Sequence, residues 1–331
     1  MSILRIAKLS KVSPATVSRV FNRPEQVSET TRALVMRVAN EAGYRPNSAA
    51  RTLRTQRSYV IGVLLPTLRN PVFAECLEGI AQKALEAGYG IMPISSGYDS
   101  RQERQAISNL LAANVAGLVL TVTDPEHRSV LADLSKAHVP YVLAYNQSPS
   151  HLCVGVNSES EVAAVVRKLA SKGHHRIAML SGHLTASDRA RSRYQGYLHG
   201  MAQAGLTPMS LIEVPFMNED DRTVQAILTK SSPRPTAVIC SNDLLALRFI
   251  RCAKGLGLCV PQDISVVGFD GIAVSAEVSP SLSTVVQPSS AIGRRAAELV
   301  LAQVSGDLIA AGSEPPMPCS FREGETIRAL R

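Results

Sequence analysis

The basic residues of this 331-residue chain are concentrated at one end, and their chemistry is the binding of a polyanion. Residues 1–58 hold eleven Lys and Arg against three acidic residues, a net charge of +8 that equals the net charge of the whole chain. The other residues carry 24 basic and 24 acidic side chains. A basic segment on a neutral body is the electrostatic signature of a nucleic-acid-binding protein. A solvated basic tail would have the same charge, but it would lack the apolar periodicity found here.

Three short helices are expected to carry these charges. Ser2 can cap a first helix, on which Ile6 and Leu9 lie three residues apart on an apolar face. Ser13 followed by Pro14 is typical of a second helix start, because the serine can accept an orphan N–H and the proline needs no donor there. The apolar residues of this second helix are Val17, Val20 and Phe21.

A third helix is expected after the cap residue Ser28, and Gly43 is placed to end it in a left-handed conformation. Its apolar residues recur at helical spacing: Leu34, Val35, Val38, Ala39 and Ala42. Three short helices, the second of which presents small and basic residues, predict a helix-turn-helix domain that reads the major groove of DNA.

The second helix supplies the candidate contacts to DNA: Pro14, Ala15, Thr16, Ser18, Arg19 and Asn22. We expect Arg19 to contact a guanine, because its guanidinium can bond O6 and N7 together. The alternative is that Arg19 binds phosphate or faces solvent. Thr16 and Ser18 are expected to bind phosphate, whereas Ala15 can make only apolar contact, for instance with a thymine methyl.

Three segments of this region resemble the LacI/GalR-type (lactose/galactose repressor) family of transcriptional regulators: residues 13–22 (SPATVSRVFN), 27–32 (VSETTR) and 43–47 (GYRPN). The resemblance continues to the C-terminus. It implies a helix-turn-helix domain over residues 1–47, a hinge over 48–58, and an effector-binding and dimerisation domain over 59–331. Lys11 departs from the family pattern, because many members have Gly in that turn, and a non-Gly residue there has a modest cost.

The hinge over residues 48–58 matches a family segment that folds on DNA and enters the minor groove. By this resemblance Asn47 and Ala50 lie at the DNA and Leu53 wedges into the central base step, an established way to kink a duplex. Without the resemblance, a leucine in a short linker such as Leu53 would be expected to pack against the body and anchor the linker there. A segment this short is not a stable helix by itself, so folding coupled to binding is expected.

From Tyr59 onward, apolar runs alternate with amphipathic stretches. Strands are expected at residues 60–65, 90–94, 116–122, 139–144, 176–180, 211–215, 237–240 and 264–269, and a final strand at 321–331. Helices are expected near 71–88, 99–114, 126–138, 158–172, 188–205, 219–230 and 242–257. This alternation predicts an α/β body with parallel sheets covered on both faces, and its length exceeds one typical core.

The resemblance implies that this body is two-lobed and periplasmic-binding-protein-like. The N-lobe would comprise about 59–157 and 288–318, and the C-lobe about 158–287 and 319–331, with crossings near 157, 287 and 318. Ligand would bind in the cleft where strands end, as is general for open α/β sheets. The residues that match effector-binding positions are Phe73, Tyr145, Arg193, Phe216, Asn242, Asp270 and Gln287.

By the same resemblance, Arg193 is the effector-binding arginine, Asp270 accepts ligand hydroxyls and Phe73 stacks on the ligand. Each position has a structural alternative: Asn242 could cap the next helix, Phe73 could belong to the core, and Asp270 could cap a turn. Arg189 and Arg191 lie close to Arg193, and three arginines together favour an anionic ligand such as a sugar acid or a phosphate.

Signatures of catalysis are missing from the sequence: it has no Gly-x-Ser-x-Gly, no Walker loop and no Gly-x-Gly-x-x-Gly. His174 and His175 are adjacent, so they cannot share one face of a helix or strand as a metal pair would. The six cysteines form no Cys-x-x-Cys motif and are expected to be reduced thiols. We therefore expect neither an enzyme nor a bound cofactor or metal, and we find no signal peptide or membrane span in the sequence.

The expected function is that of a cytoplasmic transcriptional regulator, usually a repressor, whose operator affinity is controlled by a small carbohydrate-like effector. It would act as a homodimer on a near-palindromic operator, because two-fold protein symmetry implies a palindrome. No heptad tail follows the final strand, which favours a dimer over a tetramer. The alternative, an exported or cytosolic sugar-binding protein without gene control, is disfavoured by the basic head and the missing signal peptide.

Overall fold

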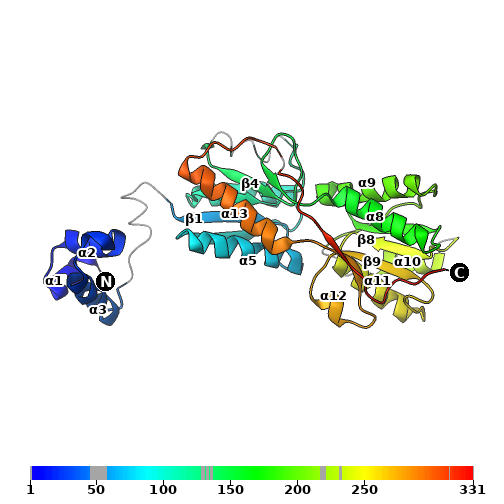
Figure 1. Ribbon diagram of the computed structural model, residues 1–331, viewed down its shortest axis with the longest axis horizontal. Coiled ribbons are helices and arrows are strands. Elements are labelled where there is room, and N and C mark those ends of the chain that lie inside the picture. The colour runs from blue at the N-terminus through cyan, green and yellow to red at the C-terminus, as the bar shows by residue number, and fades with distance from the viewer. Residues whose placement is uncertain are drawn as a thin grey trace. The chain divides into compact units, whose positions relative to one another are not determined.

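The structure is a computed structural model, and it divides into two compact units, Met1–Ser58 and Tyr59–Arg331 (Figure 1). It describes residues 2–44, 58–127, 131, 134, 137–216, 221–230, 233–312 and 314–330. We call the first unit the head and the second the body.

The head is built from short helices, as expected. They are α1 (Ile3–Ser10), α2 (Pro14–Asn22), a 3-10 helix (Pro24–Gln26) and α3 (Glu29–Glu41). The side chains of Ser2, Ser13 and Ser28 accept the backbone N–H groups of Arg5, Thr16 and Thr31. Each hydroxyl satisfies a donor that the first turn of its helix leaves unpaired, so all three predicted caps are confirmed.

The core of the head contains most of the predicted apolar residues: Ile6, Ala7, Val17, Val20, Val35 and Ala39. Two expectations were wrong, because Leu9 is 54% exposed and Leu34 is 36% exposed. Successive residues of a helix are about 100° apart. The buried face of α1 is centred between Ile6 and Ala7, which leaves Leu9 on its flank.

The turn between α1 and α2 contains Lys11 in the left-handed region, with φ 53° and ψ 36°. The N–H of Lys11 bonds back to the end of α1, so the turn forms without the glycine common in this family, at the conformational cost of a side chain in this region. Gly43 has φ 61° after α3, and the N–H of Tyr44 bonds to the carbonyl of Ala39. This confirms the predicted left-handed helix end.

The body contains two sheets, and the first belongs to its N-lobe. Its strands are β1 (Val60–Leu65), β2 (Gly90–Ser95), β3 (Gly117–Leu120), β4 (Tyr141–Ala144) and β5 (Cys153–Val154). They are parallel throughout, in the order β2-β1-β3-β4-β5. Helices α5 (Pro71–Glu86), α6 (Ser100–Ala112) and α13 (Ser289–Ser305) belong to this lobe.

The second sheet belongs to the C-lobe. Its strands are β6 (Ile177–Gly182), β7 (Ile212–Val214), β8 (Ala237–Cys240), β9 (Ser265–Asp270), β10 (Ser283–Val286) and β11 (Ser320–Arg322). The order is β11-β10-β9-β8-β6-β7, and only the β10–β11 pair is antiparallel. Its helices are α8 (Ser158–Ser171), α9 (Asp188–Gln203), α10 (Arg222–Lys230), α11 (Asp243–Gly255) and α12 (Val274–Glu277), with the 3-10 helix Leu184–Ala186 before α9. The predicted α/β fold with two parallel-dominated sheets is confirmed.

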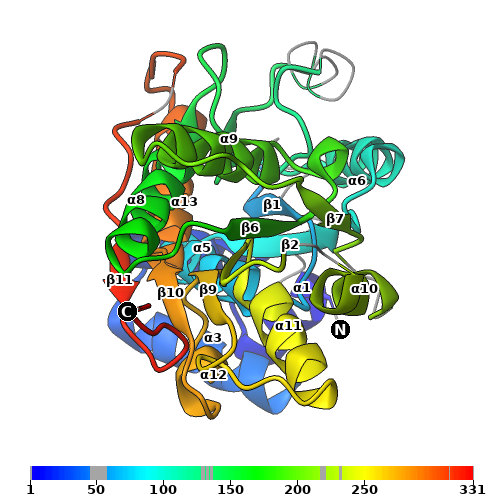
Figure 2. The ribbon, with the colours of Figure 1, turned by 90° about the vertical axis from the view of Figure 1, so that its right-hand side faces the viewer.

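In each lobe, two helices pack closely against each other. In the N-lobe α5 packs along α13, and in the C-lobe α8 packs along α9 (Figures 1 and 2). The α5–α13 crossing depends on Gly79 and Gly293, because a Cβ on either would collide with the backbone of the other helix. The chain therefore returns to the N-lobe after β10 and leaves it again before β11.

Some sequence expectations differ from the observed elements. The expected final strand over 321–331 is limited to β11, because the chain leaves the ladder at Gly324 and turns across the ends of the neighbouring strands. The sequence interpretation also named no element between residues 270 and 320, where α12, β10 and α13 lie. The helix expected at 126–138 falls largely outside the described residues. Among the described helices, none is long and apolar enough to cross a membrane.

Candidate functional site

One face of α2 projects from the head. Pro14, Ala15 and Arg19 are exposed, whereas Val17 and Val20 on the opposite face are buried in the head core. The predicted apolar stripe of this helix is thus confirmed. The Arg19 guanidinium is therefore available to a partner outside the protein, in a unit with a net charge of +8.

The polar residues of α2 are already partly used within the head. The Thr16 hydroxyl lies 2.9 Å from the Ser13 hydroxyl at the helix start, which fixes its position rather than leaving it free to rotate. Asn22 ends α2, but its side chain lies outside the described residues. Asn47, Ala50 and Leu53, together with the hinge over 48–57, also lie outside them.

The second candidate site is a cleft between the lobes of the body, where strands of both sheets end. Tyr145 follows β4 of the N-lobe, while Asn242 follows β8 of the C-lobe and Asp270 is the last residue of β9. These strands are parallel to their neighbours within each of the two sheets, and the residues at their carboxyl ends line one cleft. The polar contacts of the cleft divide into an inner compartment around Asp270 and an outer cavity along α11.

Asp270 is the centre of the inner compartment. Its carboxylate accepts one hydrogen bond from the Asn70 amide and one from the Gln287 amide, both at 2.9 Å, and lies 3.5 Å from the Arg193 guanidinium. The residue is 4% exposed, and this burial raises the pKa of its carboxyl against the lowering effect of Arg193. Its φ of 120° is rare for a non-Gly residue, and such strain is typical of functional positions.

Arg193 reaches this carboxylate from α9. It also donates to the carbonyl of Ser241, and its guanidinium lies 3.8 Å from the centroid of the Phe269 ring. Its Nε is buried without a hydrogen-bond partner. The guanidinium therefore retains one donor that the described residues do not satisfy.

Two residues expected at the effector site also have the structural roles named as alternatives: Asn242 caps a helix and Phe73 belongs to the core. The side chain of Asn242 caps α11 by accepting the N–H of Leu245 at 2.8 Å, and Phe73 is 4% exposed within the N-lobe core. Phe73 packs edge-on against Tyr145 with 5.6 Å between ring centroids, and the Tyr145 hydroxyl donates to the carbonyl of Val72. Both rings still line the inner compartment, as Asn242 does.

Two stacked aromatic rings separate the compartments. Tyr98, after β2 of the N-lobe, stacks on Phe216, after β7 of the C-lobe, with 4.3 Å between centroids and 14° between planes. Gly182 makes room for Phe216, because a Cβ there would collide with the ring. The inner compartment has a volume of about 20 Å³, whereas the outer cavity has about 410 Å³. Of these two spaces, the outer cavity can therefore admit a small molecule larger than a water in this conformation, and the inner compartment cannot.

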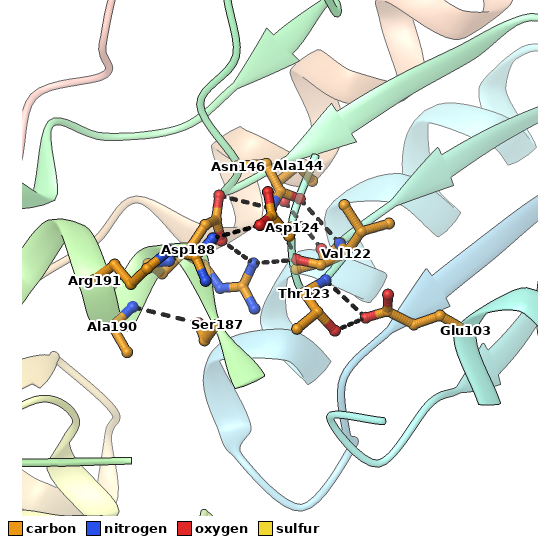
Figure 3. A network of polar contacts seen from close by, with 12 residues as sticks. Glu103, Val122, Thr123, Asp124, Ala144, Asn146, Ser187, Asp188, Ala190 and Arg191 are labelled. Atoms are coloured by element: carbon orange, nitrogen blue, oxygen red, sulfur yellow. Dashed lines mark hydrogen bonds and ion pairs between the residues drawn. The ribbon is translucent and has the colours of Figure 1, made fainter. Parts of the chain in front are cut away.

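A polar network joins the lobes at the start of α9 (Figure 3). Asp188 accepts a hydrogen bond from the Asn146 amide at 2.8 Å, and the N–H of Asp188 donates to the carbonyl of Thr123 at 2.9 Å. Thr123 in turn donates its N–H and its hydroxyl to the buried carboxylate of Glu103 on α6. Burial raises the pKa of both Glu103 and Asp188.

The three arginines at the start of α9 do not supply spare positive charge. Arg189 lies 2.9 Å from Asp188, Arg191 lies 3.2 Å from Asp124, and Arg193 lies 3.5 Å from Asp270. Each guanidinium is matched by one carboxylate. The expectation that this cluster favours an anionic ligand stays a prediction. The carboxylate partners of Arg191 and Arg193 are distant in sequence, so the sequence did not reveal these ion pairs.

The structure brings together the seven residues expected at the cleft: Phe73, Tyr145, Arg193, Phe216, Asn242, Asp270 and Gln287 all line the inner compartment. Sequence reasoning missed Asn70 and Tyr98. Both lie in loops that follow strands of the N-lobe sheet, and this strand-end position is the signal that could have identified them.

Comparison with known proteins gives two family matches. The model of bacterial regulatory proteins of the lacI family matches residues 2–47, and the model of a periplasmic binding protein-like domain matches residues 166–327. The chain is 33% identical over 306 residues to the ribose operon repressor of Haemophilus influenzae, with 90% of each protein covered. It is 31% identical over 330 residues to the HTH-type transcriptional repressor CytR of Escherichia coli, covering 98% of this chain and 96% of that protein.

Among solved structures, the chain matches a crystal structure of the lac repressor dimer bound to operator and the anti-inducer ONPF. The TM-score is 0.86 and the sequence identity is 27%, over 99% of each chain. The likeness therefore covers the head, the body and their order in the chain. This chain belongs to the LacI family, and it is a DNA-binding transcriptional regulator of that family rather than an enzyme.

Proposed function

We propose that this regulator acts as a cytoplasmic homodimer on a near-palindromic operator, and that a small carbohydrate-like effector bound in the cleft of the body controls its operator affinity. Two features support the assembly. The similar lac repressor structure is a dimer on operator DNA, and two heads related by a two-fold axis would meet a palindrome in successive major grooves.

The observation that carries the effector proposal is the donor and acceptor set around Asp270. A carboxylate, a guanidinium and two amides surround one point at the carboxyl ends of the strands, with aromatic rings beside them. Hydroxyl groups of a sugar can replace such donors and acceptors, while the apolar face of the sugar packs on a ring. We assign effector contacts to Arg193, Asp270, Gln287 and Asn242, and ring contacts to Phe73, Tyr145 and Phe216.

The DNA contacts in this proposal come from the exposed face of α2 and from the hinge. Arg19 contacts a guanine, and Thr16 and Ser18 bind phosphates of the DNA backbone. Pro14, Ala15 and Asn22 form the rest of the surface of α2 that contacts DNA. Asn47 and Ala50 lie at the DNA, and Leu53 wedges into the central step as the family resemblance implies.

The DNA assignment is tested on an operator selected from random sequences by the full-length protein. Arg19→Ala should cost about 1–3 kcal/mol of binding free energy on that operator and much less on random DNA. Arg37→Ala, which removes an exposed arginine from α3, is the charge-matched control and should not lower the preference for the operator. Equal losses on both DNAs for Arg19→Ala would reduce Arg19 to a phosphate contact.

The effector assignment is tested on the same operator complex by fluorescence anisotropy with a panel of sugars, sugar acids and sugar phosphates. The active compound should change operator affinity by about 5–150-fold, the usual range of allosteric coupling. Arg193→Ala should abolish this response and retain operator binding. A response that survives in Arg193→Ala would place the effector outside the cleft.

A further inference from the structure

The outer cavity differs in chemistry from the inner compartment. Four of its lining residues are shared with the inner compartment, and three are leucines of α11. The other four are polar or basic: Thr67, Arg69, Arg248 and Arg251. Its volume of about 410 Å³ lies within the range of small-molecule pockets, roughly 300–1,000 Å³. It is therefore large enough to hold the part of a ligand that the inner compartment cannot.

One face of α11 forms the wall of this cavity. Leu244, Leu247, Arg248 and Arg251 recur at intervals of three and four residues, so their side chains lie on the same side of the helix. The helix is fixed in this orientation by the Asn242 cap and by buried apolar residues on its other side. The two arginines are thus held beside an apolar surface.

The charged residues that line the outer cavity are all basic. Three arginines and no carboxylate are among the described lining residues, and the carboxylate of Asp221, outside the lining, lies 2.6 Å from Arg251. Arg248 differs from the paired arginines of α9. Its Nη1 is buried and has no hydrogen-bond partner in the part of the chain that the structure describes.

A buried guanidinium nitrogen without a partner is costly, and it gains most from an acceptor that carries negative charge. Phosphate and carboxylate oxygens match the planar fork of an arginine, whereas sugar hydroxyls do so less well. The leucines beside Arg248 exclude water from one side, which strengthens an ionic contact there.

We propose that the effector carries an oxyanion, a phosphate or a carboxylate, and that Arg248 binds it in the outer cavity. This inference rests on the proposed function, and it specifies the class of ligand for the same cleft. The hydroxyl-bearing part of the effector lies toward Asp270, past the Tyr98–Phe216 stack. The oxyanion lies against α11, with Arg251 contributing positive charge nearby.

The first test uses inorganic phosphate as the probe. Unfolding of the full-length protein is followed by calorimetry in phosphate and in chloride at equal ionic strength. Phosphate should raise the midpoint of the native protein in a saturable way, beyond the general stabilisation that excluded anions give. The saturable part should be lost in Arg248→Gln and retained in Arg167→Gln, an exposed arginine of α8 that bonds to Gln203. Phosphate bound by the basic head affects all three proteins alike, so an equal shift in all three would overturn the proposal.

The second test compares matched pairs by isothermal titration calorimetry: ribose with ribose 5-phosphate, glucose with glucose 6-phosphate, and glucose with gluconate. We expect the anionic member of one pair to bind more tightly than the neutral member, and Arg248→Gln to weaken it about 10–100-fold. Arg248→Lys should recover part of the affinity, and the phosphate and carboxylate pairs identify which oxyanion is used.

Two outcomes separate the inference from the proposed function. If a neutral sugar binds as tightly as its anionic partner and Arg248→Gln leaves it unaffected while Arg193→Ala abolishes binding, the oxyanion is refuted and effector binding in the cleft stands. If the anionic member binds equally in native protein, Arg193→Ala and Arg248→Gln, both the oxyanion site and the cleft assignment are refuted.

Discussion

Asp270→Asn tests whether the buried carboxylate holds the cleft together in the absence of ligand. The change keeps the shape of the side chain and removes its charge, so Arg193 loses its ionic partner at 3.5 Å. One of the two amide donors at 2.9 Å, from Asn70 or Gln287, would also face the new NH2 group. Breaking a buried pair by removing one partner costs about 3–5 kcal/mol, and because Arg193 keeps the Ser241 carbonyl we expect the lower end, about 3 kcal/mol.

The measurement is urea unfolding of the body followed by far-ultraviolet circular dichroism, since the chain has no tryptophan to serve as a fluorescent probe. Asp307→Asn, at an exposed position after α13, is the matched control and should change the free energy of unfolding by no more than about 0.5 kcal/mol. Combining Asp270→Asn with Arg193→Gln should cost less than the sum of the single changes. A loss below about 1 kcal/mol for Asp270→Asn would refute the reasoning, because an uncompensated buried arginine cannot be that cheap.

Two further predictions concern the turn between α1 and α2 in the head and the pH dependence of the stability of the body. Lys11→Gly should raise the thermal midpoint of the head, because a left-handed φ of 53° costs a side-chain-bearing residue about 1 kcal/mol relative to glycine; an unchanged or lower midpoint would show that this turn is not strained. The body should lose stability between about pH 4 and pH 7, since burial raises the pKa of Asp243 from 3.8 to about 7 and the folded state therefore keeps a proton that the unfolded chain releases. That contribution is complete below the unfolded pKa and is lost as pH rises through the folded one, so the urea midpoint should be lower at pH 7.5 than at pH 5.5, by less in Asp243→Asn; a midpoint that rises with pH would contradict this sign.

Local rules were sufficient for much of the fold. Caps such as Ser13 and buried runs such as residues 60–65 need only neighbouring residues to be recognised, and the structure contains both as expected. β10 was not predicted because Ser283 and Thr284 are polar yet fully buried. Their burial depends on distant partners: the Thr284 hydroxyl donates to the carboxylate of Asp243, and the Ser283 hydroxyl accepts the N–H of Gly324. In contrast α13 carries a readable signal, since its buried residues Ile292, Ala296 and Val300 recur every four residues.

The sequence predicted many of the residues that line the cleft, but it did not predict which of their side chains form ion pairs and hydrogen bonds with one another. Strand ends and the family resemblance together placed residues such as Asp270 and Gln287 at one cleft, and the structure brings them there. No spacing in the sequence shows that Arg191 is matched by Asp124, or that Arg248 has a nitrogen without a partner. Charge balance in a cleft depends on contacts between elements that are far apart in the chain, so the number of arginines in one helix does not determine it.

The hydrogen bond between Asn70 and Asp270 bears on how a ligand could control this protein. Asn70 caps α5 in the N-lobe, while Asp270 ends β9 in the C-lobe, so their hydrogen bond connects the two lobes. A ligand hydroxyl that takes the place of one amide at Asp270 replaces either this bond or that of Gln287. A ligand can shift a conformational equilibrium only by as much as its affinities for the two states differ. Replacing the bond from Asn70 changes a contact between lobes, whereas replacing the bond from Gln287 does not remove that contact. The effector that controls this protein is therefore expected to compete with Asn70.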